Sequence, residues 1–315
     1  MSRSRFATPS IAPGSGAAQG REMERVDLFI TDRCNQRCIF CYLCSRGLRK
    51  MRSQFPRKDI EDALAAGRRR GYDEVYISGG EPTVDPRLPD IIRRSRELGY
   101  ERVKMMSNGI RLADPRYAFL LAASGLTHLA LSVHGASAGI YAAVHGRTED
   151  FARCARAVEN LHQRASGVSV EINTVATREN LASLPALCAW TQAAAISRLH
   201  AQLLVPNSPE AAAHFPGHRR AAAVFRRVLA EYGSRLRISF AFIPPCLMGE
   251  DESAVPGFDF TMSFFTNRPD MILTWQRSLL AAKRVLHACA RCLRWPGCRG
   301  FWAPAGPAGA VEKKW

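Results

Sequence analysis

The chain has 315 residues, ten cysteines and a formal net charge of +16. This length suits one large domain with a smaller appendage, and no apolar stretch approaches the roughly 20 residues that a membrane-spanning helix needs. Ten cysteines without a secretory signal segment indicate a reducing compartment and metal binding rather than a disulfide-stabilised fold. We therefore expect a cytoplasmic protein without a membrane partner.

Residues 1–23 are rich in Ser, Ala, Gly, Pro and Arg without apolar periodicity, which predicts a disordered basic tail. Beyond it, short apolar runs alternate with helical patterns. The predicted strands are Val26–Thr31, Glu74–Ser78, Val103–Ser107, His128–Val133, Val168–Val175 and Leu199–Val205. The predicted helices lie near residues 57–70, 87–98, 115–124, 149–164 and 179–195. Such alternation predicts βαβ units, and therefore an α/β core with a parallel sheet over residues 24–210.

Cys34, Cys38 and Cys41 follow the first predicted strand within eight residues. Three thiolates this close can hold one inorganic cluster, and iron–sulfur clusters normally use four protein ligands. One metal position would then stay open to another ligand, which is typical of a catalytic site. A structural zinc site is the alternative, with Cys44 as the fourth ligand, although zinc sites usually pair their cysteines as Cys-x2-Cys.

Two basic runs invite a nucleic-acid interpretation, because clustered Lys and Arg bind phosphate backbones. They are Arg46, Arg49, Lys50, Arg52, Arg57 and Lys58, and then Arg68-Arg69-Arg70. No RNA-binding motif with interleaved aromatic residues accompanies them. We favour a solvated surface and keep RNA as an alternative partner.

Polar groups follow the ends of several predicted strands. The run Gly79-Gly80-Glu81-Pro82-Thr83 combines glycines, which let backbone approach a ligand closely, with a carboxylate suited to an ammonium group. The carboxyl ends of parallel strands share one side of a sheet, so side chains there should converge. The other candidates are Ser107, Ser132, His134 and Asn173. Serines and asparagines also cap turns, and a histidine is either a proton carrier or a buried structural residue.

Four further cysteines stand beyond residue 210, which is the right number to enclose a second metal centre. They are Cys246, Cys289, Cys292 and Cys298. A structural zinc site is again the alternative. Cys154 and Cys188 fall within helical patterns instead, where we expect them to be buried and inert.

The Cys-x3-Cys-x-Phe-Cys spacing, followed by Gly79-Gly80-Glu81-Pro82, resembles the radical S-adenosylmethionine (SAM) superfamily. The resemblance implies a partial (β/α)6 barrel like an open TIM barrel, with Cys34, Cys38 and Cys41 holding a 4Fe-4S cluster that binds SAM. It also implies that residues 211–315 form a SPASM- or Twitch-like extension in which the four later cysteines hold an auxiliary 4Fe-4S cluster. The positions it assigns to SAM binding are Phe40, Gly79, Gly80, Glu81, Pro82, Ser107, Ser132 and Asn173.

By the same resemblance, the protein is an enzyme that reductively cleaves SAM to a 5′-deoxyadenosyl radical and abstracts hydrogen from a substrate. A reductant such as flavodoxin or ferredoxin would supply the electron. Enzymes with such extensions mostly mature peptides, cofactors or natural products, so we expect a peptide or small-molecule substrate. Two alternatives stay open: an RNA-modifying radical SAM enzyme, and an iron–sulfur redox sensor or binding protein without catalysis.

Overall fold

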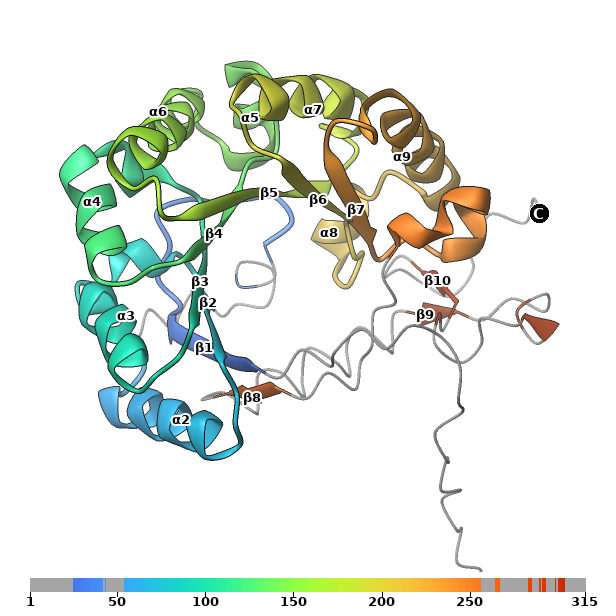
Figure 1. Cartoon of the computed structure of the whole chain (residues 1–315). Helices are drawn as coiled ribbons and strands as arrows, with labels where there is room; N and C mark the ends of the chain where they lie inside the picture. Colours follow the sequence, from blue (N-terminus) through green and yellow to red (C-terminus); the bar gives the residue numbers. More distant parts are fainter. Residues whose placement is uncertain are drawn as a thin grey trace, which may run out of the picture.

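The computed structural model describes residues 25–41, 43, 54–255, 264–266, 283–284, 289, 291–292, 298 and 300–303. Its centre is a curved parallel sheet, open between its two end strands, in the order β7-β6-β5-β4-β3-β2-β1-β8 (Figure 1). The strands are β1 (Arg25–Thr31), β2 (Glu74–Gly79), β3 (Arg102–Ser107), β4 (His128–Ser132), β5 (Ser169–Ala176), β6 (Arg198–Leu203), β7 (Arg237–Ala241) and β8 (Phe264–Thr266). The predicted α/β fold of a partial barrel is confirmed.

Helices line the outer face of the curved sheet (Figure 1). They are α2 (Arg57–Arg69), α3 (Leu88–Glu97), α4 (Pro115–Ala123), α5 (Ala138–His145), α6 (Glu149–Arg164), α7 (Leu184–Ala193) and α9 (His218–Tyr232). The short helix α8 (Pro209–Ala213), which follows β6, lies on the inner side of this ring of helices (Figure 1). Local signals set several of their ends: Asp114 caps α4 through the backbone N–H of Arg116, and Ser137 caps α5 through that of Ile140. No helix in the described ranges is long and apolar enough to cross a membrane.

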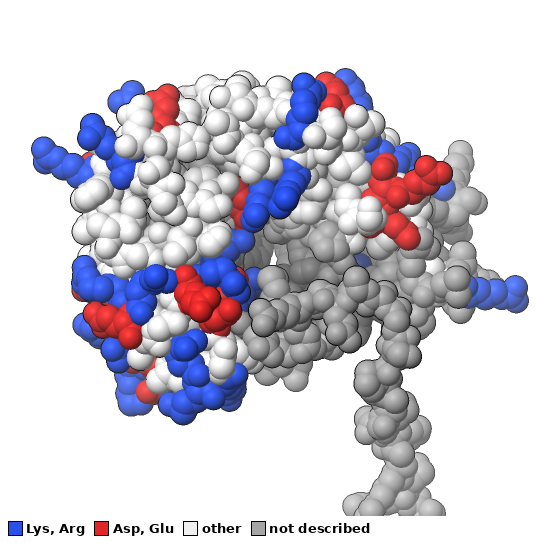
Figure 2. All heavy atoms as spheres, viewed as in Figure 1, with Lys and Arg blue, Asp and Glu red and all other residues white. Residues whose placement is uncertain are grey.

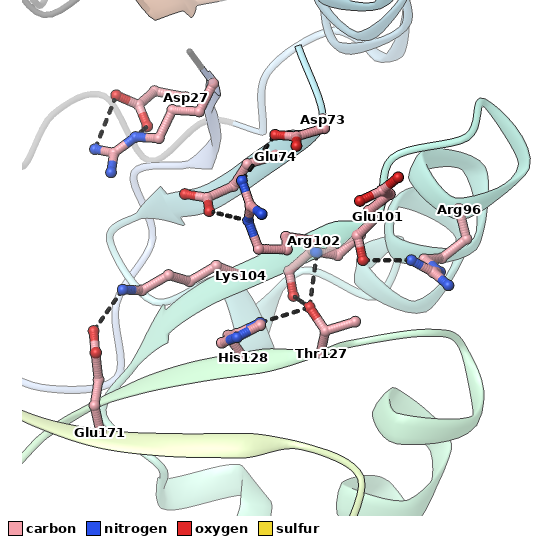
Figure 3. Close-up of polar contacts among 12 residues, drawn as sticks. Asp27, Asp73, Glu74, Arg96, Glu101, Arg102, Lys104, Thr127, His128 and Glu171 are labelled. Carbon is pink, nitrogen blue, oxygen red and sulfur yellow. Dashed lines mark hydrogen bonds and ion pairs between the residues drawn. The ribbon is translucent and has the colours of Figure 1, made fainter. Parts of the chain in front are cut away.

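Alternation along each strand separates the core from the inner face of the barrel. Val26, Leu28 and Ile30 of β1 are fully buried in the hydrophobic core that the helices cover. The residues that alternate with these core positions face the inside of the barrel, and several of them are charged near the amino-terminal ends of the strands (Figure 3). Lys104 of β3 there pairs with Glu171 of β5 at 2.5 Å. These ion pairs occupy the end of the barrel opposite to the side where βα loops gather.

The C-terminal hairpin, formed by β9 (Lys283–Arg284) and β10 (Phe301–Trp302), docks near the carboxyl end of β7 (Figure 1). The indole Nε1 of Trp302 donates a 2.5 Å hydrogen bond to the carbonyl of Phe242, and the backbone N–H of Trp302 donates to Nε2 of His218 at 3.0 Å. Phe242 has the left-handed φ of 63°, a strained conformation for an aromatic residue. The strained backbone at Phe242 therefore directs the carbonyl of this residue toward the hairpin.

The predicted helices do not include α5 or α8, and the structure also differs from the predicted elements in the extent of the sheet and in the start of α7. The sheet continues past residue 210, because α9 and β7 add one more unit with a buried apolar stripe that includes Phe225 and Val228. Strand β8 adds to the far edge beside β1. The helix predicted over residues 179–195 begins only at Leu184, with Pro185 in its first turn. The predicted tail, residues 1–23, lies outside the described residues.

Candidate functional site

The cysteine loop, residues 32–41, packs directly on the glycine turn that ends β2. The backbone N–H of Gly80 donates to the carbonyl of Thr31, and that of Glu81 to the carbonyl of Arg33, both at 2.8 Å. A Cβ on Gly79 would lie 2.2 Å from the Thr31 carbonyl oxygen, and one on Gly80 would lie 2.3 Å from that of Arg33. Both glycines are therefore required for the approach of the loop's own backbone, whatever ligand binds there.

Glu81 joins this turn to the end of β3. Its carboxylate is 1% exposed and accepts four hydrogen bonds. Oε1 receives the backbone N–H and hydroxyl of Thr83 and the hydroxyl of Ser107, whereas Oε2 receives the backbone N–H of Asn108 at 2.7 Å. Burial raises the pKa of Glu81 although these hydrogen bonds oppose the shift. The Glu81 carboxylate, which we expected to contact the ammonium group of a ligand, is also the centre of a hydrogen-bond network within the protein.

The cysteine loop has two further anchors. On one side, Asn108 Nδ2 donates to Asn35 Oδ1 at 2.7 Å. On the other, Gln36 Nε2 lies 3.2 Å from Asp150 Oδ2 and 3.3 Å from the hydroxyl of Tyr141, so α5 and α6 hold the loop. The loop is thus fixed between the turn after β3 and the helices after β4.

The three cysteines sit on this loop without being buried: Cys34 is exposed, and Cys38 and Cys41 are half-buried. The backbone N–H of Gln36 points to Cys34 Sγ at 3.4 Å, and His145 Nδ1 lies 3.1 Å from Cys38 Sγ. Among the described residues, no group of three His, Cys, Asp or Glu side chains is arranged as a metal site. The donor set nevertheless fits an iron–sulfur cluster, because three soft sulfurs share one accessible loop and two of them meet nitrogen atoms.

Rings extend from this loop into the core. Phe40 meets His134 edge-on with centroids 4.9 Å apart, and His134 stacks on His145 at 4.8 Å. The backbone N–H of Val175 donates to Nδ1 of His134 at 3.0 Å, so the neutral ring carries its hydrogen on Nε2. Burial lowers the pKa of His134 well below its usual value. This environment favours the structural alternative for His134 over a proton carrier.

Asn173 and Ser132 are register partners on β5 and β4. Asn173 is buried and accepts a hydrogen bond from Gln202 Nε2 at 3.3 Å, whereas Ser132 is half-buried. Pro82 lies in the short helix that follows Glu81. SAM contacts by these residues and by Phe40 stay predictions.

Three of the later cysteines lie in the chain between the two strands of the docked hairpin, and the fourth follows β7. Cys246 is exposed in the short helix Pro245–Leu247 after β7, and Cys289, Cys292 and Cys298 are half-buried. The backbone N–H of Cys292 donates to the carbonyl of Cys289 at 3.1 Å, so a tight turn brings these two positions together. Lys283 Nζ donates to the carbonyl of Cys298 at 3.3 Å and lies 4.0 Å from the centroid of the Trp302 ring. Cys154 and Cys188 are fully buried, as predicted, and burial raises the pKa of each thiol to about 12.

The residues that hold the cysteine loop in place were not among the predicted site residues. They are Asn35, Gln36, Asn108, Tyr141, His145 and Asp150. Asn35 and Gln36 lie between the cysteines and Asn108 lies beside Ser107, so proximity to the motifs was the available signal. The other three belong to α5 and α6, and no sequence pattern connected those helices with the loop.

The comparisons agree with this geometry. The Radical SAM superfamily profile matches residues 28–190, which include the cysteine loop, the glycine turn and the ends of β3, β4 and β5. The chain belongs to the radical SAM superfamily. Its members use a 4Fe-4S cluster together with SAM, which confirms these two predicted cofactors.

Relatives and solved structures extend the likeness along the chain. A probable GTP 3′,8-cyclase of Methanopyrus kandleri is 31% identical over 220 residues, which are 70% of this chain and 67% of the relative. One of Saccharolobus solfataricus is 30% identical over 161 residues, 51% of this chain and 50% of the relative. The chain thus spans half to two thirds of these curated relatives. SuiB of Streptococcus suis bound to S-adenosylmethionine shares the fold, with a TM-score of 0.63 and 17% identity over 88% of this chain and 72% of SuiB.

Proposed function

We propose that the protein is a radical SAM enzyme whose active site lies where the cysteine loop, the glycine turn and the turn after β3 meet. The observation that carries the proposal is the continuous hydrogen-bonded contact among these three segments. Glu81 bonds to Ser107 and Asn108, and Asn108 bonds to Asn35 of the cysteine loop. The three family elements are thereby held in one place before any ligand binds.

Within this site, the residues of the chain would bind the cluster and SAM and orient them. Cys34, Cys38 and Cys41 would hold the cluster, and Glu81, Ser107 and the neighbouring backbone would position SAM. When bound, the cluster and SAM supply the electron transfer and the 5′-deoxyadenosyl radical that takes hydrogen from a substrate. Anchoring by Gln36 and Asn35 would keep the thiols in register with the SAM-binding turns, since reaction requires close alignment of the reacting atoms.

The alternative function that is not enzymatic is an iron–sulfur redox sensor or binding protein. The glycine turn does not exclude it, because Gly79 and Gly80 are already required for seating the cysteine loop. Membership of an enzyme superfamily, with a match that spans both motifs, supports catalysis. Measurement of SAM cleavage separates the two.

We also propose that an extension beginning after β7 binds an auxiliary 4Fe-4S cluster through Cys246, Cys289, Cys292 and Cys298. Support comes from the contact between Trp302 and Phe242. Cys298 precedes Trp302 by four residues and Cys246 follows Phe242 by four, so each lies within about 14 Å of extended chain from that contact. Zinc is the alternative metal. Replacing Cys289 and Cys292 together by Ala should lower the iron content, and loss of zinc with unchanged iron would select the alternative.

For the substrate, we propose a small-molecule cofactor precursor or a peptide. Curated relatives are named for a cyclisation of GTP, and SuiB has been solved with a precursor peptide at a TM-score of 0.54. GTP is therefore the first small molecule to test. A reductant of the flavodoxin or ferredoxin type would deliver the electron.

RNA modification has less support. On the face in Figure 2, basic side chains over α2 and α3 stand among acidic ones. Lys58 pairs with Asp62, and Arg94 with Glu61. The residues of the first basic run between 46 and 52 lie outside the described part of the chain. Paired charges attract a phosphate backbone less than a uniform basic surface does.

The decisive experiment measures release of 5′-deoxyadenosine by anaerobically reconstituted protein given SAM and dithionite. GTP, a peptide-rich extract fraction and an RNA fraction are added separately. Release that one addition stimulates, lost in Cys38→Ala and kept in Cys188→Ala, would establish the enzyme and its substrate class. No release from protein that contains the cluster would favour the sensor.

A further inference from the structure

His145 makes a direct contact with a cysteine of the cysteine loop. It ends α5, is 2% exposed, and brings Nδ1 to 3.1 Å from Cys38 Sγ. Its ring stacks on Tyr141 at 4.2 Å and on His134 at 4.8 Å. The backbone N–H of Ile39 also donates to the carbonyl of Val144 at 3.1 Å, which ties the loop to the same turn of α5. The imidazole is therefore held in one orientation by its neighbours rather than by the thiol alone.

The position of the imidazole hydrogen follows from the partners of the two ring nitrogens. Nε2 is buried and has no hydrogen-bond partner among the described residues. A hydrogen on Nε2 would leave a buried N–H unsatisfied and would also direct the Nδ1 lone pair at the lone pairs of a ligating thiolate. A hydrogen on Nδ1 leaves only a bare ring nitrogen buried and lets the N–H point at sulfur. The Nδ1–H form is therefore the favourable one when Cys38 is a cluster ligand.

The geometry points to His145 as an N–H donor to the Cys38 thiolate that raises the reduction potential of the cluster. This inference rests on the proposed function, since it requires the cluster on Cys34, Cys38 and Cys41. Hydrogen bonds to ligand sulfurs withdraw negative charge, and so they stabilise the reduced, more negative cluster. His145 would act as a positioning and tuning residue through Cys38, without touching SAM or substrate.

Another N–H group faces a sulfur of the cysteine loop, but it belongs to the backbone. The Cys34 sulfur faces the backbone N–H of Gln36 at 3.4 Å, which every substitution of Gln36 except proline keeps. The Cys38 sulfur faces a side chain that can be exchanged. The contribution of His145 can therefore be measured with the loop backbone intact.

The test compares midpoint potentials of the reconstituted, full-length protein by EPR-monitored redox titration. His145→Phe keeps a ring for stacking but removes the N–H, and His145→Asn keeps an N–H donor at the corresponding position. His162→Phe, at an exposed site on α6, is the matched control. The SAM-binding cluster is recognised by the change in its EPR signal when SAM is added.

We expect His145→Phe to shift the potential to more negative values, whereas His145→Asn and His162→Phe stay near the wild type. A tenfold fall in the ratio of reduced to oxidised cluster at fixed potential corresponds to about 59 mV for one electron. An unchanged potential in His145→Phe with full iron content would overturn the inference and leave the proposed function intact. Wild-type protein without a SAM-responsive cluster would overturn both.

A second measurement uses the wild-type protein and does not depend on the variants folding. Protein labelled with 15N at histidine is reduced, and pulsed EPR of the SAM-responsive cluster is recorded with the solvent exchanged for D2O. A histidine nitrogen coupling together with an exchangeable proton is expected. Absence of both couplings would exclude an N–H donor at Cys38.

Discussion

The hydroxyl of Ser107 donates a 2.7 Å hydrogen bond to Oε1 of Glu81 and accepts one from the backbone N–H of Gly109 at 3.0 Å. One side chain therefore links the carboxylate of the glycine turn to the turn after β3. Ser132 was predicted, like Ser107, to contact SAM, and it lies half-buried on the next strand. The two serines should consequently respond differently to substitution.

Ser107→Ala should lower the free energy of unfolding of the apoprotein by about 1–3 kcal/mol, because it removes a donor from a buried carboxylate. Ser132→Ala should change it by no more than about 0.5 kcal/mol. Urea unfolding followed by circular dichroism measures both. Equal effects of the two substitutions would contradict the structural role assigned to Ser107.

Gly80→Ala should displace the cysteine loop, because its Cβ would lie 2.3 Å from the carbonyl oxygen of Arg33. We expect loss of the SAM-responsive cluster even where the rest of the protein stays folded. Gly139→Ala is the control, since a Cβ there meets nothing within 4 Å and Ala stabilises a helix by roughly 0.5–1 kcal/mol over Gly. Iron content and EPR signal after reconstitution are the measurements. Full cluster retention in Gly80→Ala would show that the loop tolerates the displacement.

Gln36→Glu should prevent stable seating of the cysteine loop near neutral pH. The new carboxylate would face Asp150, which is 1% exposed and lies 3.2 Å from the Gln36 amide. Arg153 approaches the other oxygen of Asp150 at 3.5 Å and compensates little, because it is half-exposed. Gln163→Glu, on the exposed face of α6, controls for the added charge. The readout is iron retained after gel filtration, and equal retention in both variants would argue against the anchor.

Trp302→Phe should weaken docking of the C-terminal hairpin, because the indole N–H to Phe242 is lost while most apolar contact stays. The expected cost is about 0.5–1.5 kcal/mol. If the later cysteines bind a cluster, that cluster should become more easily removed by chelators while the SAM-responsive cluster is unaffected. Trp190→Phe, in α7, is the control. Equal chelator sensitivity of both variants would show that the Trp302 contact does not protect the metal centre.

Acidification should release the same hairpin. Burial, with a smaller effect of Lys283, lowers the pKa of His218 to about 4, and its Nε2 accepts the backbone N–H of Trp302. Between pH 6.5 and 4 the unfolded chain binds a proton that the folded chain does not, so stability falls as pH falls, by at most about 3 kcal/mol. His218→Gln keeps an acceptor without titrating. Its unfolding free energy should depend less on pH in this window, and identical pH profiles would contradict the role.

Strong local patterns were sufficient to predict most of the sheet. The first six strands lie within two residues of the predicted ranges, because each is an apolar run with charged or turn-forming residues at its ends. The strand-end motifs were also adequate to predict that the cysteine loop and Glu81 occupy one side of the sheet. Glu81 and Ser107 do lie together there.

The remaining features depend on contacts between distant segments. Helix α5 is short and rich in alanine, so its sequence gave no amphipathic signal, although Tyr141 and His145 meet the cysteine loop. The glycine pair was interpreted as space for a ligand, whereas the structure shows that the backbone of residues 31–33 fills that space. Pairing of β8 with β1 joins segments more than two hundred residues apart, and no local pattern predicts such a register.

Strand β8 has a consequence for the folding of the whole chain. It pairs in parallel with Arg25, Val26 and Asp27 of β1, and so it covers an edge that would otherwise offer unpaired backbone groups to other molecules. At the other side of the sheet, the hairpin of β9 and β10 docks on Phe242, just past the end of β7 (Figure 1). A protein shortened to residue 255 would retain seven strands of the sheet but expose the β1 edge, and we expect it to self-associate during expression.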